Sequence, residues 1–310
     1  MSDTAHTFTG SIDGTATPAR VRDYIDLLKP RVMSLVVFTG WIGVVIAPVH
    51  IHPFKAALAV LAIALGSGAA GAINMWYERD LDALMVRTRN RPLPAGRVAP
   101  DDALGLGVLL SIFSVLLMAV STNLVAAALL TAAILFYVFI YTIWLKRRTP
   151  HNIVIGGAAG AFPPMIGWAA ATGDVSAVGI ALFLLVFLWT PPHFWALALY
   201  RSEDYRRAGV PMLPVVAGPR ETKRQMVIYT LLLLPVALAP TLLGAVGWVY
   251  GAVALALSLG FIGHAIAVWR TADDDTAFSA ARKMFRYSLI YLAALFAALP
   301  VDLVLSRIAG

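Results

Sequence analysis

The chain has 310 residues, of which 60% are hydrophobic and only 13% are charged, and its mean hydropathy is +0.79. Because soluble domains carry about 25% charged residues, this composition excludes a soluble globular protein and predicts an all-α, polytopic membrane protein. The lack of cysteine excludes disulfides, thiolate metal sites and thiol nucleophiles. The net charge of +7 does not indicate a nucleic-acid partner, because the basic residues lie in short loops between apolar segments.

Nine apolar stretches follow a polar N-terminal segment, and each is near the roughly 20 residues that a membrane span requires. Residues 1–28 contain four aspartates and no apolar core of signal-peptide type, so we expect a disordered cytoplasmic tail that ends in an interfacial segment. Residues 29–310 then form one transmembrane domain, with about nine helices around a central cavity that opens towards the cytoplasm. The predicted spans are 32–50, 56–77, 103–121, 123–145, 152–172, 176–199, 226–245, 247–269 and 286–306.

The basic residues predict the orientation of the chain in the membrane. With the N-terminus inside, 22 of the 24 lysines and arginines fall on the cytoplasmic side, and only Lys55 and Arg307 fall outside. The carboxylates follow the same division, with only Asp174 and Asp302 outside. One membrane face therefore carries nearly all of the ionisable chemistry, and the C-terminus lies on the opposite side.

Residues 74 to 91 place three carboxylates at the end of the second span, directly before an arginine cluster. At about 100° per residue, Asn74, Glu78 and Asp82 share one helix face over two turns, whereas Asp80 points elsewhere. Mg²⁺ takes one or two carboxylates and completes its shell with water and phosphate oxygen. The pattern therefore favours a divalent cation that carries a polyphosphate. The alternative is that the carboxylates only cap the helix and pair with Arg79 or Arg87.

A second polar cluster lies at the end of the sixth span. His193, Tyr200 and Asp204 fall at i, i+7 and i+11, within about 40° of one another. This acidic helix end could hold a second cation, and two metals neutralise a diphosphate better than one. His193 follows Pro191 and Pro192, which free backbone carbonyls, so His193 alternatively donates a hydrogen bond to such a carbonyl.

Several further residues have a predicted contact or environment. Tyr141 precedes the basic stretch 146–148 by one turn, where its hydroxyl can point at phosphate. For His151, at the start of the fifth span, substrate contact and interfacial anchoring are both open. Gly156 and Gly160 have the spacing that lets helix backbones approach closely. Residues 273–275, three consecutive aspartates, lack helical spacing and predict a solvated loop.

These motifs resemble a known family. Asn74-x-x-x-Glu78-x-x-x-Asp82, followed by Arg87-Thr88-x-x-Arg91-Pro92, looks like the first acidic motif of the intramembrane (UbiA-type) prenyltransferases. Glu78 stands where that family usually has aspartate. The family's second motif is a pair of aspartates four residues apart, and here Tyr200 takes the first place and Asp204 the second. This departure, with the stretches 74–82, 191–198 and 204–215, resembles the branch of the family that acts on haem. The resemblance runs from about residue 29 to the C-terminus.

The resemblance implies an enzyme that transfers a farnesyl group from farnesyl diphosphate to a vinyl group of protohaem IX and releases diphosphate. It implies one or two Mg²⁺ ions on Glu78, Asp82 and Asp204, with Asn74 and Tyr200 completing the catalytic set. Expected diphosphate contacts are Arg87, Arg91, Tyr141, Lys146, Arg147 and Arg201, and expected haem contacts are His193 and His151. The cell inner membrane is the expected location, and a downstream haem-modifying enzyme or terminal-oxidase assembly factors are expected partners.

Two other functions stay open at this point. A sister prenyltransferase would use an aromatic acceptor such as a hydroxybenzoate or a quinone precursor, although Tyr200 and the Pro-Pro-His stretch argue against it. A secondary transporter would bind coupling ions with its carboxylates. Transporter sites lie near the membrane midplane, whereas these carboxylates lie at the cytoplasmic ends of the spans.

Overall fold

The computed structural model describes residues 19–309, and all regular structure within that part of the chain is helical. Eight helices are long and apolar enough to cross a membrane, and a ninth span results if α1 and α2, bent by 55°, count as one. The predicted all-α membrane fold is therefore confirmed. Residues 1–18 of the predicted tail lie outside the described residues.

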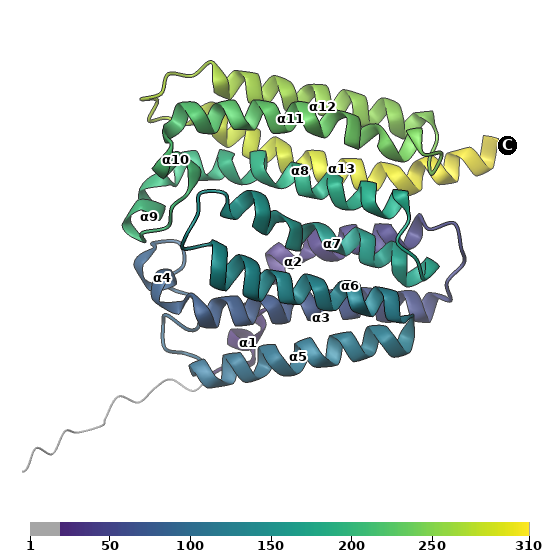
Figure 1. Ribbon diagram of the computed structural model, residues 1–310, viewed down its shortest axis with the longest axis horizontal. Helices are drawn as coiled ribbons and strands as arrows, with labels where there is room; N and C mark the ends of the chain where they lie inside the picture. The colour runs from purple at the N-terminus through teal and green to yellow at the C-terminus, as the bar shows by residue number, and fades with distance from the viewer. Residues whose placement is uncertain (1–18, 310) are drawn as a thin grey trace, which may run out of the picture.

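The long helices form a bundle with short helices at one end (Figure 1). The long ones are α2 (Pro30–Val45), α3 (Pro53–Tyr77), α5 (Pro100–Ser121), α6 (Leu124–Leu135) with its continuation η1 (Phe136–Leu145), α7 (Asn152–Thr172), α8 (Ala177–Tyr200), α11 (Gly218–Leu242), α12 (Trp248–Trp269) and α13 (Ser279–Ala309). The short ones are α1 (Val21–Leu27), α4 (Arg79–Leu84), α9 (Ser202–Arg207) and α10 (Leu213–Val216).

The N-terminal part departs from the prediction in two ways. Residues 21–27, predicted as tail, form helix α1, because Leu27 is fully buried and Asp23 accepts a hydrogen bond from Arg97 at 2.7 Å. The first span was predicted to reach residue 50, but α2 ends at Val45.

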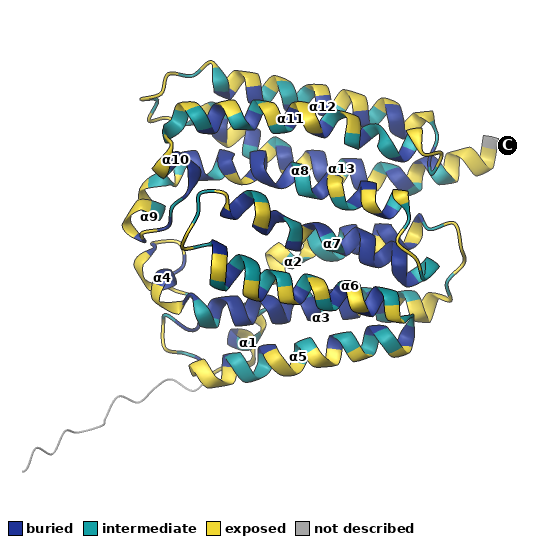
Figure 2. Cartoon of the chain, viewed as in Figure 1, coloured by how far each residue is buried: buried dark blue, intermediate teal, exposed yellow. Residues whose placement is uncertain are grey.

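Helix α7 lies at the centre of the bundle (Figures 1 and 2). In its most apolar stretch 78% of the residues are buried, against 22% in the peripheral helix α5. One hydrophobic cluster joins α7 to α2, α8, α11, α12 and α13, and another joins it to α3, α5, α6 and η1. The two halves of the bundle therefore share α7 as a common wall.

Glycines allow α2 and α7 to pack with their backbones in contact. A Cβ atom at Gly167 would lie 2.0 Å from the Gly40 carbonyl oxygen, and one at Gly43 would lie 2.1 Å from the Pro164 carbonyl oxygen. The predicted close approach through Gly156 and Gly160 is wrong, because Gly156 faces the Tyr141 ring and a Cβ at Gly160 would meet no described atom within 4 Å.

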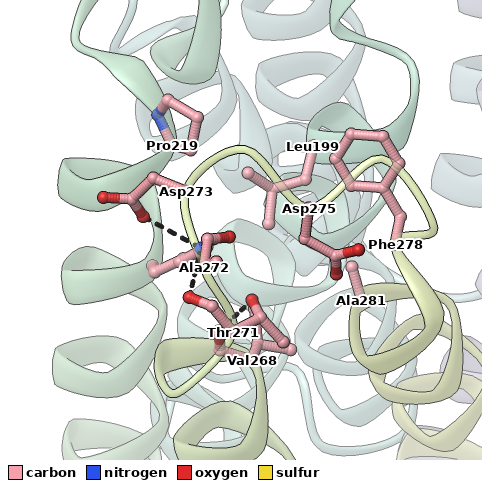
Figure 3. Close-up of a pocket in the computed structure, with 10 residues that line it drawn as sticks. Leu199, Pro219, Val268, Thr271, Ala272, Asp273, Asp275, Phe278 and Ala281 are labelled. Carbon is pink, nitrogen blue, oxygen red and sulfur yellow. Dashed lines mark hydrogen bonds and ion pairs between the residues drawn. The ribbon is translucent and has the colours of Figure 1, made fainter.

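One end of the bundle, called here the charged end, carries α4, α9 and α10 and the loop between α12 and α13, while the C-terminus lies at the other end (Figure 1). The loop with the three aspartates is irregular, as predicted. Hydrogen bonds also hold this loop against α11. Lys223 is only 4% exposed, and its Nζ donates to the carbonyls of Thr271 and Ala272 and to Asp273 Oδ1 at 2.9–3.0 Å. The pocket between this loop and α11 has a volume of about 10 Å³ (Figure 3), too small for a substrate. The predicted central cavity stays a prediction.

Candidate active site

The first acidic motif spans a break between two helices. Helix α3 ends at Tyr77, where the second span was predicted to end, and α4 begins at Arg79. The spacing survives because Glu78 N–H donates to the Asn74 carbonyl at 3.0 Å and Asp82 N–H donates to the Glu78 carbonyl at 2.8 Å. Asn74, Glu78 and Asp82 therefore still share one face, as expected.

Both carboxylates on this face are buried and paired with cations. Glu78 is 2% exposed and Asp82 is 1% exposed. Lys146 Nζ contacts Glu78 Oε2, and Arg91 contacts Asp82 Oδ2 at 2.7 Å. The alternative, in which the carboxylates only cap the helix, predicted ion pairs with Arg79 or Arg87. The observed partners are Arg91 and Lys146 instead. The structure thus unites Asn74, Glu78, Asp82, Arg91 and Lys146 of the predicted site.

Sequence reasoning missed Lys29, which completes this cluster. Its Nζ donates to Asn74 Oδ1 at 2.6 Å, and Asn74 in turn donates to Thr142 Oγ1 at 3.0 Å. The backbone of Lys29 adopts φ 53°, in the left-handed region, and its alkyl stem runs over Gly71, where a Cβ would lie 3.6 Å from Lys29 Cδ. The one signal in the sequence is that this lysine directly precedes Pro30, the residue at which α2 begins.

Helix η1 brings Tyr141 and Lys146 together. It is a π-helix, in which Lys146 N–H donates to the Tyr141 carbonyl five residues earlier at 3.0 Å. Lys146 Nζ also lies 5.6 Å from the centroid of the Tyr141 ring, within cation–π range. Single π-helical turns are often found at functional sites. Here the wider turn places the tyrosine ring beside the cation that holds Glu78.

Asp80 and Arg147 lie on the outer side of α4, away from the buried cluster. Arg147 binds both oxygens of Asp80 at 2.7 and 2.9 Å, and their side chains are 37% and 59% exposed. The hydrogen bonds from Arg147 hold the pKa of Asp80 below its usual value. Asp80 therefore points away from the shared face, as predicted, and forms a surface pair. The predicted role of Arg147 on diphosphate has no support from this placement.

The second polar cluster is more open than the first. Asp204 lies 3.8 Å from Arg201, and the Tyr200 ring packs edge-on against Phe285, with centroids 6.2 Å apart. Arg87 is exposed in the segment after α4 and makes no ion pair among the described residues.

The two acidic motifs meet through a small hydrophobic cluster at the charged end. Leu81 and Met85 from the first motif pack there with residues that flank α9, and Tyr205 of α9 borders the cluster. Helix α7 contacts both α3 and α8 behind it. The segments that follow α3 and α8 therefore pack together at the charged end. The buried members are Leu81, Met85, Ile153, Ala198, Ala208, Val210 and Met212.

A divalent cation fits Glu78 and Asp82 but not the predicted trio with Asp204. Glu78 Oε1 is buried without a hydrogen-bond partner, which is an oxygen that a cation would satisfy. Between residues 19 and 309, however, no three Asp, Glu or His side chains lie close enough together to hold a metal. The physical reason is that Asp204 sits on a separate helix beside Arg201. Mg²⁺ needs only one or two protein carboxylates when phosphate supplies further oxygens.

His193 is buried in an aromatic sandwich deeper in α8. Its ring stacks on Trp189 at 4.3 Å and on Phe285 at 4.7 Å, and its Nδ1 lies 2.6 Å from Ser288 Oγ. A hydroxyl, not a carbonyl freed by the prolines, is thus its partner. His151 is exposed at the start of α7, at the charged end.

Comparison with known proteins agrees with this geometry. Residues 35–289 match the model of the UbiA prenyltransferase family. A protoheme IX farnesyltransferase of Granulibacter bethesdensis is 57% identical over 92% of this chain and 91% of its own length. One of Parvibaculum lavamentivorans is 55% identical over 97% of this chain and 96% of its own length.

Solved structures show the same fold at low sequence identity. A digeranylgeranylglyceryl phosphate synthase superposes with a TM-score of 0.75 at 19% identity, over 91% of this chain and 97% of its own. A UbiA homolog from Archaeoglobus fulgidus bound to DMAPP and Mg²⁺ superposes with a TM-score of 0.66 at 18% identity, over 90% of this chain and 99% of its own. This chain belongs to the UbiA prenyltransferase family, within its group of protoheme IX farnesyltransferases.

Proposed function

We propose that this protein transfers the farnesyl group of farnesyl diphosphate to a vinyl group of protohaem IX, which gives haem O and diphosphate. The observation that carries the proposal is the buried pair Glu78 and Asp82, whose carboxylates form ion pairs with Lys146 and Arg91. The chain is also more than half identical to protoheme IX farnesyltransferases. An apolar bundle that ends in paired charges suits a substrate with an apolar tail and an anionic head.

The reaction breaks the C1–O bond of farnesyl diphosphate, and its electron pair leaves with the diphosphate. The haem vinyl attacks C1 through its terminal carbon, and the positive charge left beside the porphyrin takes oxygen from water, which loses a proton. A hydroxyethylfarnesyl group results.

The residues of the charged end stabilise the leaving group. Lys29, Arg91 and Lys146 provide charge-assisted hydrogen bonds to diphosphate oxygens in a buried setting, where such bonds are strong. Tyr141, beside Lys146, adds a hydroxyl. Arg201, exposed beside Asp204, and the exposed Arg87 after α4 are assigned to the outer side of the head group.

Mg²⁺, when bound, would be held by Glu78 and Asp82 and would neutralise charge on the diphosphate. Asn74 orients this face through its bonds to Lys29 and Thr142. We assign Asp204 and Tyr200 to the head-group side of the second motif, where Asp204 can bind a second cation once substrate is present.

The acceptor side of the proposal places protohaem IX against α8, with His193 as its contact and His151 at the entrance. The proposal also places the protein in the cell inner membrane with its charged end towards the cytoplasm, and the 22 basic residues predicted on that side support this orientation. A downstream haem-modifying enzyme or oxidase assembly factors would receive the product.

Purified protein in nanodiscs tests the proposal. We expect radiolabelled farnesyl diphosphate to label protohaem IX, with release of diphosphate that stops when EDTA removes Mg²⁺. Labelling of 4-hydroxybenzoate in place of haem would make the protein a sister prenyltransferase. Ion-driven solute uptake into proteoliposomes, without diphosphate release, would make it a transporter.

A further inference from the structure

Ser288 of α13 links to His193 of α8 in a way that determines where the histidine proton lies. Ser288 is fully buried, and its hydroxyl donates to the Phe285 carbonyl at 2.7 Å. A serine hydroxyl has a single proton to donate. With that proton on the Phe285 carbonyl, Ser288 Oγ accepts a hydrogen bond from His193 Nδ1, 2.6 Å away. This arrangement puts the imidazole proton on Nδ1.

The other ring nitrogen keeps its lone pair. Among the described residues His193 has only Ser288 as a hydrogen-bond partner, and no carboxylate contacts it, so burial between two aromatic rings favours the neutral ring. A neutral ring protonated on Nδ1 has an unprotonated Nε2. His193 is 7% exposed, and Nε2 has no hydrogen-bond partner among the described residues, so its lone pair is free for a ligand.

The same serine also holds the ring that stacks on the histidine. The Ser288 carbonyl accepts from Trp189 Nε1 at 2.9 Å, and Trp189 lies 4.3 Å from His193 between ring centroids. Ser288 thus fixes both the edge and one face of the imidazole from a neighbouring helix. Histidines that bind metals are commonly held in this way by a hydrogen bond to the second nitrogen.

We infer that Ser288 is a positioning residue, which holds His193 with its Nε2 lone pair directed to the haem iron of the acceptor. This inference rests on the proposed function, because it needs protohaem IX as a substrate. It assigns to α13, which carries neither acidic motif, a part in binding the acceptor.

Nitrogen NMR on protein labelled with ¹⁵N-histidine tests the proton position without haem. The chain has only 6 histidines, and loss of one signal in His193→Gln assigns the resonance. We expect a protonated Nδ1 and a bare Nε2 in the native protein, and a shift towards the opposite tautomer in Ser288→Ala. A native His193 protonated on Nε2 would overturn the inference.

Haem titration tests the consequence. Ser288→Ala should lower haem affinity by about 10-fold or more, the usual effect of removing a partner of a metal-binding histidine, and should change the Soret band as His193→Gln does. Ser288→Thr keeps the hydroxyl and should restore both. Ser258→Ala is the matched control, because Ser258 is equally buried but contacts Tyr291 instead.

The outcomes separate the two proposals. If His193→Gln changes haem binding and Ser288→Ala does not, Ser288 is not a positioning residue. If neither variant changes haem binding while farnesyl transfer to haem persists, the iron is bound elsewhere and the inference fails. If no haem binds to any variant, the proposed acceptor itself is wrong.

Discussion

Each buried carboxylate of the first acidic motif has one oxygen paired with a basic side chain from a different segment. Lys146 comes from η1 and Arg91 from the loop after α4, so two chain segments orient Glu78 and Asp82 before any ligand arrives. Such preorganised charge is where enzymes obtain most of their electrostatic stabilisation. The remaining Glu78 oxygen is buried without a hydrogen-bond partner among the described residues, so it is free to bind a cation.

Asp82→Asn tests the metal role of this pair. The change keeps the shape of the side chain but removes its charge, so kcat should fall by about 100-fold or more, since a bound cation supplies several kcal/mol. Raising the Mg²⁺ concentration should recover part of the loss, and Asp82→Ala should abolish turnover. Steady-state rates of diphosphate release measure these effects.

The control for Asp82 is its neighbour on the same short helix. Asp80→Asn removes an equal charge from an exposed pair with Arg147 and should leave kcat within about twofold, since surface ion pairs contribute little. If Asp82→Asn kept the native kcat at every Mg²⁺ concentration, Asp82 would not hold the metal.

Lys29 should bind the diphosphate of the donor. In Lys29→Met the alkyl stem over Gly71 is kept and only the ammonium group is lost. We expect KM for farnesyl diphosphate to rise by about 10-fold to 100-fold, as hydrogen bonds to charged groups contribute about 1.5–3 kcal/mol. Lys55→Met, an exposed lysine at the other end of the molecule, should leave KM unchanged. An unchanged KM in both variants would reduce Lys29 to a partner of Asn74.

At the scale of helices, spacing in the sequence predicted side-chain faces better than helix contacts. The four-residue spacing of Asn74, Glu78 and Asp82 was enough to predict a shared face, because backbone hydrogen bonds continue through the break at Glu78. The Gly156–Gly160 spacing predicted the wrong contact, since small residues permit an approach without specifying the partner. The close approach uses Gly40, Gly43 and Gly167, which are distant in sequence.

Gly167→Ala should destabilise the bundle, whereas Gly160→Ala should not. Both glycines lie in α7, but the new methyl group at Gly167 would lie 2.0 Å from the Gly40 carbonyl and force α2 outward. We expect a loss of about 1–3 kcal/mol in the free energy of unfolding. Gly160→Ala meets open space and gains helix propensity, so it should be neutral or slightly stabilising. Unfolding in mixed detergent micelles compares the two, and equal stabilities would refute the contact.

For the whole molecule, hydropathy alone predicted the spans to within a few residues at most ends. Hydropathy did not reveal α1, whose packing depends on one buried residue. It also did not reveal Lys29, whose backbone conformation is rare for a lysine. Helix α1 folds because Leu27 is buried within a polar stretch, and Lys29 reaches the site through a left-handed backbone. Ser288 lies 95 residues from His193, a pairing that no local pattern reveals.

The orientation of the molecule can be tested because the chain has no cysteine of its own. A single cysteine at exposed Thr276 would report on the charged end, and one at exposed His50 would report on the opposite end. If the basic residues set the orientation, a maleimide that cannot cross membranes should label His50→Cys in spheroplasts, and Thr276→Cys only in inverted vesicles. The reverse pattern would place the diphosphate site outside the cytoplasm, away from a donor whose charge keeps it from crossing a bilayer unaided. The direction of labelling therefore decides whether the charged end can receive its substrate from the cytoplasm.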